Sequence, residues 1–477
     1  MAAARRAAGW LGLLCHVAPT AGRASSGKHP FPTRGINYNR SGYTPDYAAP
    51  FPLPAEPSWT YEVPALVRHQ TSSVDEDLNV YSGSDKGVLQ SYNKLGRLRW
   101  TVQAGFSAVQ NPTVKGNVLY TSTGDGLAQA YDKDSGRLIW ESRISEKLPG
   151  DTYSPSAFDD FVIYPAGALW PYGCTEVVSV SQSDGSVRWR YSVGDKYGGA
   201  TGEFSKNGIG PKYSTVNLAP CYWNNTIIFN DVSGAMYGLS AVDGKELWYT
   251  PGDDKDMYTL GGSCCGPNGK IYLGLSTSPG KGAMQVLDVR TGEKLWRKPY
   301  PKEVHSAPAV GYINGVLTAV NGVGSPTGPY PYPKLDIWGM LLMNLTLSVQ
   351  GLLGRLPVHS FTGYVIAVNA ETGEDIWRFE PPSWHEPFCA GSSAELPCLP
   401  DLWSGPTIDA AGTVWINWSA GGILYGLRDA NGDGKVDRND PAETTAYDCG
   451  SAATGPPSVA DGMIVTTTCR RVVAFVS

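Results

Sequence analysis

The sequence predicts an all-β protein built from repeated four-stranded units. Gly (57 residues) and Pro (36 residues) make up about a fifth of the 477-residue chain, a composition that implies many turns. Long helical stretches with charge patterning are absent, whereas short runs of alternating apolar residues recur throughout. Hydrophobic residues amount to 42%, which is enough for a sizeable core.

A repeated segment identifies half of the unit. Six copies contain an alternating apolar strand, a glycine-containing turn and a strand that ends in Trp; they span residues 87–100, 126–140, 176–189, 234–248, 282–296 and 363–377. A seventh copy, 422–437, keeps the first strand and changes the turn. The turn glycine supplies a positive φ, and the Trp ring can fill the space between neighbouring units. Because one hairpin cannot bury both of its faces, the units must stack.

A second strand pair precedes each hairpin, as in residues 107–124, 264–280 and 458–469. Two pairs give the four antiparallel strands of one propeller blade. The closing tryptophans of six blades are Trp100, Trp140, Trp189, Trp248, Trp296 and Trp377.

The two ends of the chain complete the count of blades. The strand at 422–428 marks a seventh blade. No Trp strand follows the C-terminal strand 471–477, and no strand precedes Trp59, so these two pieces together form an eighth. We therefore expect an eight-bladed β-propeller closed by its N- and C-terminal strands. A count of seven stays open if one unit is degenerate.

The turn motif resembles the pyrroloquinoline quinone (PQQ) repeat of quinoprotein-like propellers. Its best copies are Ala367–Trp377 and Leu287–Trp296, in which Thr-Gly precedes the final Trp. The resemblance covers residues 35–477, and residues 34–45 are similar to the lead-in before the first strand of such proteins. No Trp-Asp dipeptide occurs, which excludes the WD40 type. The resemblance implies the fold, and fold alone does not imply function.

Residues 1–24 are predicted to be a secretory signal peptide. Arg5 and Arg6 form a basic start, residues 7–18 are mostly apolar, and small residues follow. An organelle transit peptide is the rival interpretation, because the segment contains Arg and Ser and no acidic residue. We expect a secreted protein or one of the endomembrane lumen, with organelle import as the alternative.

Cysteine usage favours an oxidising compartment. After removal of Cys15 with the signal peptide, an even number remains: Cys174, Cys221, Cys264, Cys265, Cys389, Cys398, Cys449 and Cys469. Spacing suggests the disulfides Cys389–Cys398 and Cys449–Cys469, which leaves Cys174–Cys221 and a vicinal Cys264–Cys265 pair. Sequence alone leaves this connectivity open. Four candidate N-glycosylation sites agree with a secretory route: Asn39, Asn224, Asn344 and Asn417.

The strongest chemical motif is a calcium-loop pattern at residues 429–440, in place of the usual turn of the seventh blade. Oxygen ligands at alternate positions wrap a hard cation, and Gly434 permits the sharp bend. The expected ligands are Asp429, Asn431, Asp433, the backbone carbonyl of Lys435, Asp437 and Asp440. Since no amphipathic helices flank it, the site would be structural: bound Ca²⁺ would rigidify a long hairpin. An acidic, metal-free turn is the alternative.

An insertion of about 30 residues lies at about 326–360. Its centre, 337–354, carries no charge, but polar residues such as Asn344 interrupt it. We expect a hydrophobic helix docked on the propeller. Contact with a membrane or a partner is the alternative, and a true membrane span is the least favoured interpretation.

The resemblance also raises quinone chemistry. PQQ-dependent alcohol dehydrogenases carry a vicinal disulfide over the quinone, so Cys264 and Cys265 are weak candidates for contact with a cofactor. Their position in mid-chain departs from the family pattern. Glu203 resembles a metal-binding Glu but precedes the cysteines, which is the wrong order, and Asn321 is only loosely similar to the family's Asn ligand.

Other functions find little support in the sequence. The net charge is −6 and no basic run exceeds two residues, which argues against nucleic acid as a partner. Neither a G-x-S-x-G elbow nor a P-loop occurs. We expect a binding or scaffold propeller for a protein, peptide or glycan, with structural Ca²⁺ and no chemistry of its own. The alternative is a PQQ- and Ca²⁺-dependent dehydrogenase of alcohols or sugars.

Overall fold

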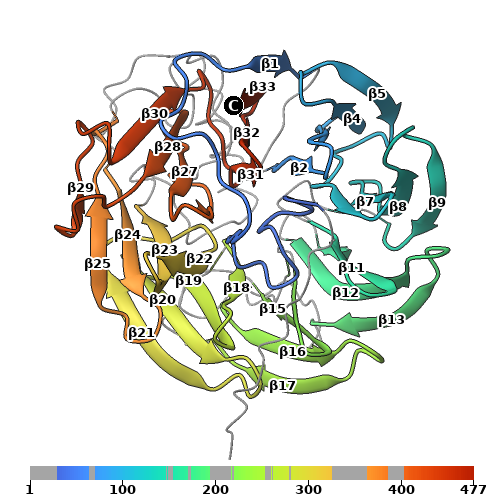
Figure 1. Cartoon of the computed structure of the whole chain (residues 1–477). Helices are drawn as coiled ribbons and strands as arrows, with labels where there is room; N and C mark the ends of the chain where they lie inside the picture. Colours follow the sequence, from blue (N-terminus) through green and yellow to red (C-terminus); the bar gives the residue numbers. More distant parts are fainter. Residues whose placement is uncertain are drawn as a thin grey trace, which may run out of the picture.

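The computed structural model describes residues 29–63, 70–146, 148, 154–169, 173–193, 216, 220–231, 233–252, 259, 261–278, 281–324, 362–384 and 402–477. Within this part of the chain there are 33 strands and no helix. The strands form eight sheets arranged as blades around a central axis (Figure 1), and all their strand pairs except β25–β29 are antiparallel. The predicted eight-bladed propeller is therefore confirmed.

Each blade has four strands, which follow one another from the central channel outwards. Blade 1 contains β2 (Ser73–Val74), β3 (Val80–Gly83), β4 (Val88–Tyr92) and β5 (Leu98–Gln103). Blade 2 contains β6 (Thr113–Lys115), β7 (Val118–Ser122), β8 (Leu127–Asp132) and β9 (Leu138–Arg143). Blade 3 contains β10 (Ser156–Ala157), β11 (Phe161–Leu169), β12 (Gly173–Ser181) and β13 (Val187–Ser192). Blade 4 contains β14 (Cys221–Trp223), β15 (Thr226–Asn230), β16 (Met236–Ser240) and β17 (Glu246–Thr250).

The second half of the chain repeats this order. Blade 5 contains β18 (Ser263–Cys265), β19 (Lys270–Ser278), β20 (Lys281–Asp288) and β21 (Lys294–Tyr300). Blade 6 contains β22 (Ala309–Ile313), β23 (Val316–Val323), β24 (Tyr364–Asn369) and β25 (Asp375–Phe379). Blade 7 contains β26 (Thr407–Ile408), β27 (Val414–Trp418), β28 (Ile423–Leu427) and β30 (Thr444–Asp448). Blade 8 contains β31 (Ser458–Ala460), β32 (Met463–Thr467), β33 (Arg471–Val476) and β1 (Trp59–Glu62).

Blade 8 closes the ring with both ends of the described chain. β1 pairs antiparallel with β33, so that Trp59 lies opposite Ala474 and Glu62 opposite Arg471. Trp59 thus has the strand partner that the sequence predicted for it. Closure pairs the last strand of the fold and leaves no blade incomplete.

The Trp and Gly of the repeat meet across blade boundaries. The Trp140 indole of blade 2 donates to Gln182 O in the blade 3 turn at 2.8 Å. A Cβ added to Gly185 of that turn would lie 2.5 Å from the Trp140 ring. The glycine is therefore needed twice, for its positive φ of 73° and for the space that the ring occupies.

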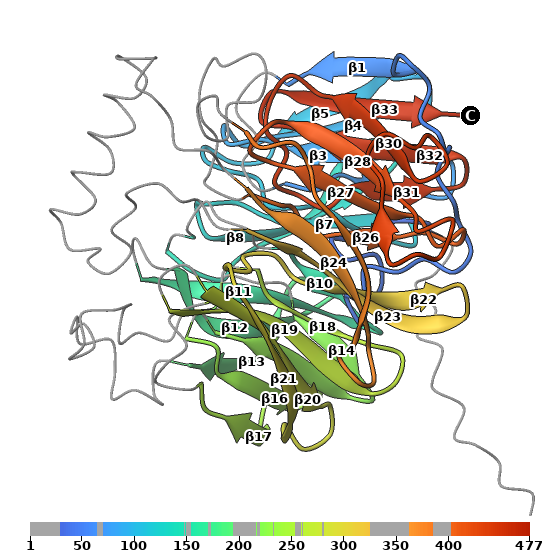
Figure 2. The ribbon, with the colours of Figure 1, turned by 90° about the vertical axis from the view of Figure 1, so that its left-hand side faces the viewer.

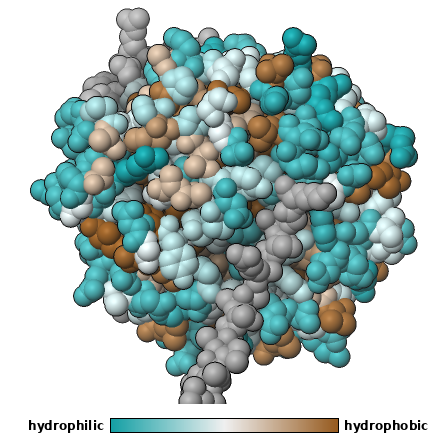
Figure 3. Space-filling view, in the orientation of Figure 1, coloured by the Kyte–Doolittle hydropathy of each residue, from teal (hydrophilic) through white to brown (hydrophobic). Residues whose placement is uncertain are grey.

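The two faces of the propeller carry different connections. Because strands alternate in direction, links between blades and links between second and third strands leave from one face, which we call the loop face. The opposite turn face carries the links between first and second and between third and fourth strands. The longest stretches of sequence between successive strands begin at the ends of β13, β23 and β25, and these strand ends lie at the loop face. Figure 3 shows the turn face, where hydrophobic residues are scattered among hydrophilic ones.

The calcium-loop-like segment departs from a simple hairpin. β29 (Lys435–Val436), which lies between β28 and β30, pairs in parallel with β25 and becomes a fifth strand of blade 6. Val436 is buried there against Trp377 and Phe379. An apolar residue in the long turn thus covers the outer edge of the neighbouring blade.

The hydrophobic segment at 337–354, for which a docked helix was predicted, lies outside the described residues, as does the predicted signal peptide at 1–24. In the part of the chain that the structure describes, no helix has the length and apolar character that a membrane span needs.

Candidate binding site in the central channel

One segment before β1 closes the channel at the turn face. Residues 31–44, which we call the N-terminal hub, cross the centre in front of the blades, and Figure 2 shows this blue segment along one side of the disc. Its carbonyls accept backbone N–H bonds from innermost strands of six blades: Phe31 from Val74 (2.8 Å), Pro32 from Val114 (2.8 Å), Tyr38 from Tyr222 (2.8 Å), Asn39 from Cys265 (2.8 Å), Ser41 from Val310 (2.7 Å) and Gly42 from Ile408 (2.7 Å). These strand edges would otherwise face the channel unpaired.

Arg40 joins the hub to blades 3 and 4. Its guanidinium donates to Pro155 O at 3.1 Å, Ser156 Oγ at 2.7 Å and Pro220 O at 3.4 Å, and also to Thr33 Oγ1 at 2.6 Å and the Arg34 carbonyl. All of these acceptors are neutral. Burial lowers the pKa of Arg40 to about 9, which leaves the side chain charged at neutral pH. The charge is thus held by carbonyl and hydroxyl oxygens that converge on the channel.

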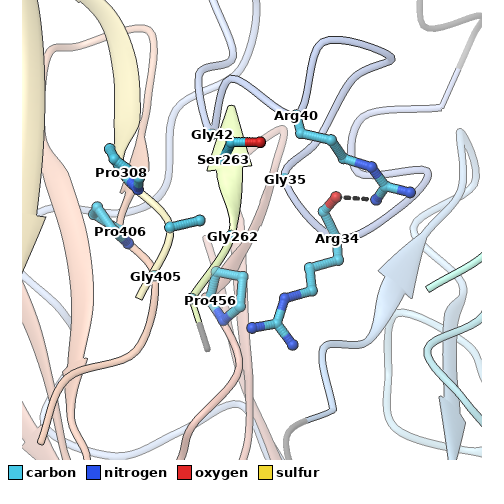
Figure 4. A pocket seen from close by; sticks show the side chains of 12 residues that line it. Arg34, Gly35, Arg40, Gly42, Gly262, Ser263, Pro308, Gly405, Pro406 and Pro456 are labelled. Carbon is cyan, nitrogen blue, oxygen red and sulfur yellow. Dashed lines mark hydrogen bonds between the residues drawn. The ribbon is translucent and has the colours of Figure 1, made fainter. Parts of the chain in front are cut away.

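A small cavity lies beside the hub. It has a volume of about 40 Å³ and is lined by Arg34, Gly35, Arg40, Gly42, Gly261, Gly262, Ser263, Ala307, Pro308, Gly405, Pro406 and Pro456 (Figure 4). The wall comes from chain that directly precedes innermost strands. In six blades a proline occupies this position: Pro112, Pro155, Pro220, Pro308, Pro406 and Pro457. Such a cavity holds a few waters or a small ion.

The described channel residues do not fit PQQ. A flat cofactor of that size needs a pocket of roughly 300 Å³ or more, and the cavity has about 40 Å³. Its lining contains two arginines but neither a carboxylate nor a tryptophan. Asn321 is fully buried with neither amide atom hydrogen-bonded, yet it does not line this cavity. Glu203 lies outside the described residues.

Cys264 and Cys265 lie within the blades and do not face the channel. They occupy successive positions of β18 and point to opposite sides, because side chains alternate along a strand. Cys264 packs in the core beside blade 6, and Cys265 in the core beside blade 4. Both are thiols, and burial raises the pKa of each well above its usual value. The predicted vicinal disulfide is absent from this structure, because the two side chains lie on opposite sides of the strand.

The other predicted pairings also need correction. Cys469 is disulfide-bonded, whereas Cys449 is a buried thiol, so the Cys449–Cys469 pair is wrong. Cys174 and Cys221 pack in different core clusters, so the Cys174–Cys221 pair is absent from this structure. Close spacing in sequence misled the prediction, because pairing depends on which strands meet. Cys389 and Cys398 lie outside the described residues.

The acidic side chains of the calcium-loop segment bind their own backbone. Asp429 Oδ1 and Oδ2 accept from Gly432 N at 3.0 Å and Gly434 N at 3.2 Å. Asp433, Asp437 and Asp440 likewise each accept an N–H two residues further on. Within the described ranges, no group of three or more His, Cys, Asp or Glu is placed to hold a metal ion. These contacts describe a self-capped acidic turn.

Glu443 is a residue of this loop that the motif did not reveal. It is almost fully buried, and its carboxylate accepts from Asp437 N at 2.8 Å and Asn431 N at 3.3 Å. It therefore braces both halves of the loop from inside. The sequence signal that could have identified Glu443 is an acidic residue directly before β30.

The predicted glycosylation sites differ in accessibility. Asn417 is fully buried, and its amide donates to Gly455 O at 2.9 Å, so a glycan on it is incompatible with the fold. Asn39 is half-buried within the hub, whereas Asn224 lies exposed in the turn between β14 and β15. Asn344 lies outside the described residues. Asn224 is the described position that suits the modification.

Comparison with curated proteins finds two kinds of relative. BamB of Shewanella oneidensis, an outer membrane protein assembly factor, is 22% identical over 292 residues, which cover 58% of this chain and 68% of that protein. The quinohemoprotein alcohol dehydrogenase ADH-IIG of Pseudomonas putida is 24% identical over 274 residues, which cover 53% of this chain. The match spans only 36% of that enzyme.

Solved structures give the same pair of likenesses. The quinohemoprotein alcohol dehydrogenase from Comamonas testosteroni superposes with a TM-score of 0.62 at 15% identity, over 95% of this chain and 81% of the enzyme. BamB from Moraxella catarrhalis superposes with a TM-score of 0.53 at 13% identity, over 87% of this chain and 98% of that one. At such identities the likeness shows the fold alone.

A family model assigns the chain. The model described as outer membrane protein assembly factor BamB matches residues 56–217 and 172–325. Together these ranges make up more than half of the 477 residues. The chain therefore belongs to the BamB-like family of PQQ-repeat β-propellers.

Proposed function

We propose that this protein is a binding or scaffold propeller that holds a protein or peptide partner on its loop face. The observation that carries the proposal is the closure of the channel by the N-terminal hub at the turn face. With the hub across that side, the loop face, where the strand ends that lead from β13 to β14, from β23 to β24 and from β25 to β26 lie, is left for a partner. Propeller loops that converge around a channel form a natural concave binding surface.

An exposed aromatic residue supports this choice of face. Phe106, in the link from β5 to β6 on the loop face, is 96% exposed. Its backbone N–H is held by Asp125 Oδ2 at 2.6 Å, in the neighbouring loop of blade 2. An exposed aromatic ring on a held backbone segment is a typical anchor for a partner. The assembly role named for BamB agrees with a protein partner.

The compartment proposed is extracytoplasmic. The family is named for an outer membrane assembly factor. The predicted signal peptide and the exposed Asn224 sequon point to export as well. The structural calcium loop at 429–440 is also part of the proposal.

Selection from a random-peptide display library on the immobilised full-length protein tests the proposal. We expect Phe106→Asp to weaken the selected peptides by about tenfold or more. The matched control is Val242→Asp, because Val242 is also strongly exposed (78%) but lies in a turn of the opposite face. Peptides that lose affinity with Val242→Asp and not with Phe106→Asp would contradict binding at the loop face.

A PQQ- and Ca²⁺-dependent dehydrogenase of alcohols or sugars is the second candidate, and the dehydrogenase relatives support it. The described channel does not fit the quinone, so this function would depend on residues outside the described ranges. Titration of the purified protein with PQQ, with and without Ca²⁺, tests it through tryptophan fluorescence. Saturable, Ca²⁺-dependent quenching at one PQQ per chain supports the enzyme. No binding at about tens of micromolar contradicts it.

A further inference from the structure

The boundary between blades 4 and 5 lacks the indole hydrogen bond that four other boundaries possess. Indole N–H groups lock successive blades at four boundaries: Trp59 to Lys94 O (3.0 Å), Trp100 to Lys133 O (3.0 Å), Trp140 to Gln182 O (2.8 Å) and Trp189 to Ala241 O (3.0 Å). Trp248, at the boundary of blades 4 and 5, still packs on the Gly292 turn, but its Nε1 is buried and has no hydrogen-bond partner among the described residues.

The next boundary has a substitute. Trp296 of blade 5 also leaves its Nε1 without a partner in the described part of the chain. There the Tyr272 hydroxyl donates to Ala370 O at 2.9 Å, in the turn of blade 6. Within the described ranges, blades 4 and 5 lack the indole bond, and at their outer ends the Thr250 hydroxyl donates to Gly292 O at 2.6 Å instead.

Two cysteines face each other at this boundary. Cys221 of β14 and Cys265 of β18 belong to one core cluster together with Ile228, Ile271 and the flanking Trp248. Burial raises the pKa of Cys265, and the neighbouring Cys221 thiol raises it further. Cys221 is 1% and Cys265 0% exposed, so both sulfurs lie in the dry interface.

The hub holds the two strands in register with each other. Tyr222 N donates to Tyr38 O and Cys265 N donates to Asn39 O, both at 2.8 Å. These acceptors are consecutive carbonyls, so β14 and β18 cannot drift apart without breaking the hub. The Arg40 guanidinium, which donates to Pro220 O, also interacts electrostatically with Cys221.

We propose that Cys221 and Cys265 form a disulfide between blades 4 and 5 when the protein folds in an oxidising compartment. The Cys221 thiolate attacks a disulfide oxidant, such as oxidised glutathione or a dithiol oxidoreductase, and a mixed disulfide results. The Cys265 sulfur then displaces the carrier thiol. Two S–H bonds break and one S–S bond forms, while two electrons and two protons pass to the oxidant.

Side-chain direction favours Cys265 over Cys264 as the partner of Cys221. Cys264 points to the other side of β18, so it lies in a different core cluster from Cys221. The disulfide would join the inner ends of blades 4 and 5, whereas the Thr250 hydroxyl joins their outer ends. It encloses β15 to β17, the whole outer part of blade 4, within one covalent loop.

Peptide mass spectrometry of the full-length protein, purified from an oxidising compartment and alkylated under denaturing conditions without reductant, tests the proposal. We expect one cross-linked pair of peptides containing Cys221 and Cys265, with Cys264 alkylated. Cys265 found alkylated, or Cys221 found linked to Cys174, would overturn it.

A stability comparison gives an independent readout. We expect Cys221→Ser and Cys265→Ser each to lower the midpoint of thermal unfolding by roughly 5–10 °C relative to the oxidised wild type. The double variant should lose no more than either single one, because both remove the same bond. Cys264→Ser is the matched control and should leave the cross-link intact. Strictly additive losses in the double variant would contradict a shared disulfide.

Discussion

The Trp140 indole donates to Gln182 O at 2.8 Å, while Gly185 of the same turn leaves room for its ring. This relationship explains why Gly and Trp recur together in the repeat. Each turn glycine accommodates the tryptophan of the preceding blade, as Gly96 does for Trp59, Gly136 for Trp100 and Gly244 for Trp189. The repeated motif is thus a contact between two units as well as a feature of one.

Substitution of the turn glycine should separate its two roles, which are to adopt a positive φ and to leave space for the Trp ring. Gly185→Ala is expected to destabilise the protein by about 3 kcal/mol, from left-handed strain plus the clash with Trp140. Gly116→Ala is the matched control, because Gly116 also has positive φ (55°) but a Cβ there meets no atom within 4 Å. It should lose only about 1 kcal/mol. Urea unfolding measures the stability of both variants. Equal losses would contradict the contact between Gly185 and the Trp140 ring.

Removal of the buried guanidinium should open the channel at the turn face. Arg40→Ala leaves the buried oxygens of Pro155 and Ser156 without their donor and is expected to destabilise by at least about 3 kcal/mol. Arg40→Lys should recover only part of the lost stability, since an ammonium group cannot reproduce the five N–H donors of a guanidinium. Arg34→Ala, in the same cavity wall, keeps the Arg34 carbonyl and serves as the control. A fully stable Arg40→Ala variant in the same urea assay would show that the hydrogen bonds of Arg40 are dispensable for stability.

Acid sensitivity should arise at the boundary of blades 1 and 2. Burial alone would raise the pKa of Asp75, but hydrogen bonds from Asn79 and Tyr81 and the Lys133 charge outweigh it and lower the pKa. Tyr81 Oη lies 2.7 Å and Lys133 Nζ 3.2 Å from Asp75 Oδ2. For a carboxyl with a lowered folded pKa, the stabilisation is complete above the unfolded value of about 4 and is lost as pH falls through the folded value.

Asp75→Asn therefore provides the comparison. At pH 7 it should be less stable than wild type, and the gap should narrow below about pH 4, as measured by urea unfolding across that range. Asp461→Asn, in an exposed turn, should leave the pH profile unchanged. If the stability difference between wild type and Asp75→Asn stays constant down to about pH 3, the effect of the substitution does not come from the carboxylate charge.

The calcium-loop hypothesis makes a separable prediction. Millimolar Ca²⁺ should raise the thermal midpoint of wild type, and Asp433→Ala should abolish this rise, because Asp433 would supply a ligand oxygen at the fifth position of the motif. Glu443→Gln should lower stability with or without Ca²⁺, since its carboxylate braces Asn431 N and Asp437 N. An unchanged midpoint in Ca²⁺ would leave the segment as a metal-free turn.

The fold was accessible from sequence because it rests on local periodicity repeated along the chain. Alternating apolar residues, turn glycines and closing tryptophans mark each blade without knowledge of any contact between blades. Trp59 could be assigned to the last blade because the C-terminal unit lacked its final Trp strand, whereas the strand at Trp59 had no strand before it. Radial stacking then follows from burial of both faces of each sheet.

The candidate site was much less predictable. Cysteine spacing suggested Cys449–Cys469, but Cys469 is bonded elsewhere and Cys449 is a thiol. The sequon at Asn417 gave no sign that its amide is buried and bonded to Gly455. Likewise, the calcium motif did not show that Val436 crosses to the edge of blade 6.

The sequence by itself determined the repeat, the position of the blade turns and an expected count of eight blades, because these depend on residues close together in one repeat. The way the ring closes followed from the same pattern, since the last unit lacked a Trp strand and Trp59 supplied one. Only the tertiary structure decided that the hub shuts the turn face and that Cys221 meets Cys265. Those contacts join residues from different blades, and their distances depend on how the blades pack around the axis. Local patterns carry no information on such distances, which arise when all eight sheets bury their faces together.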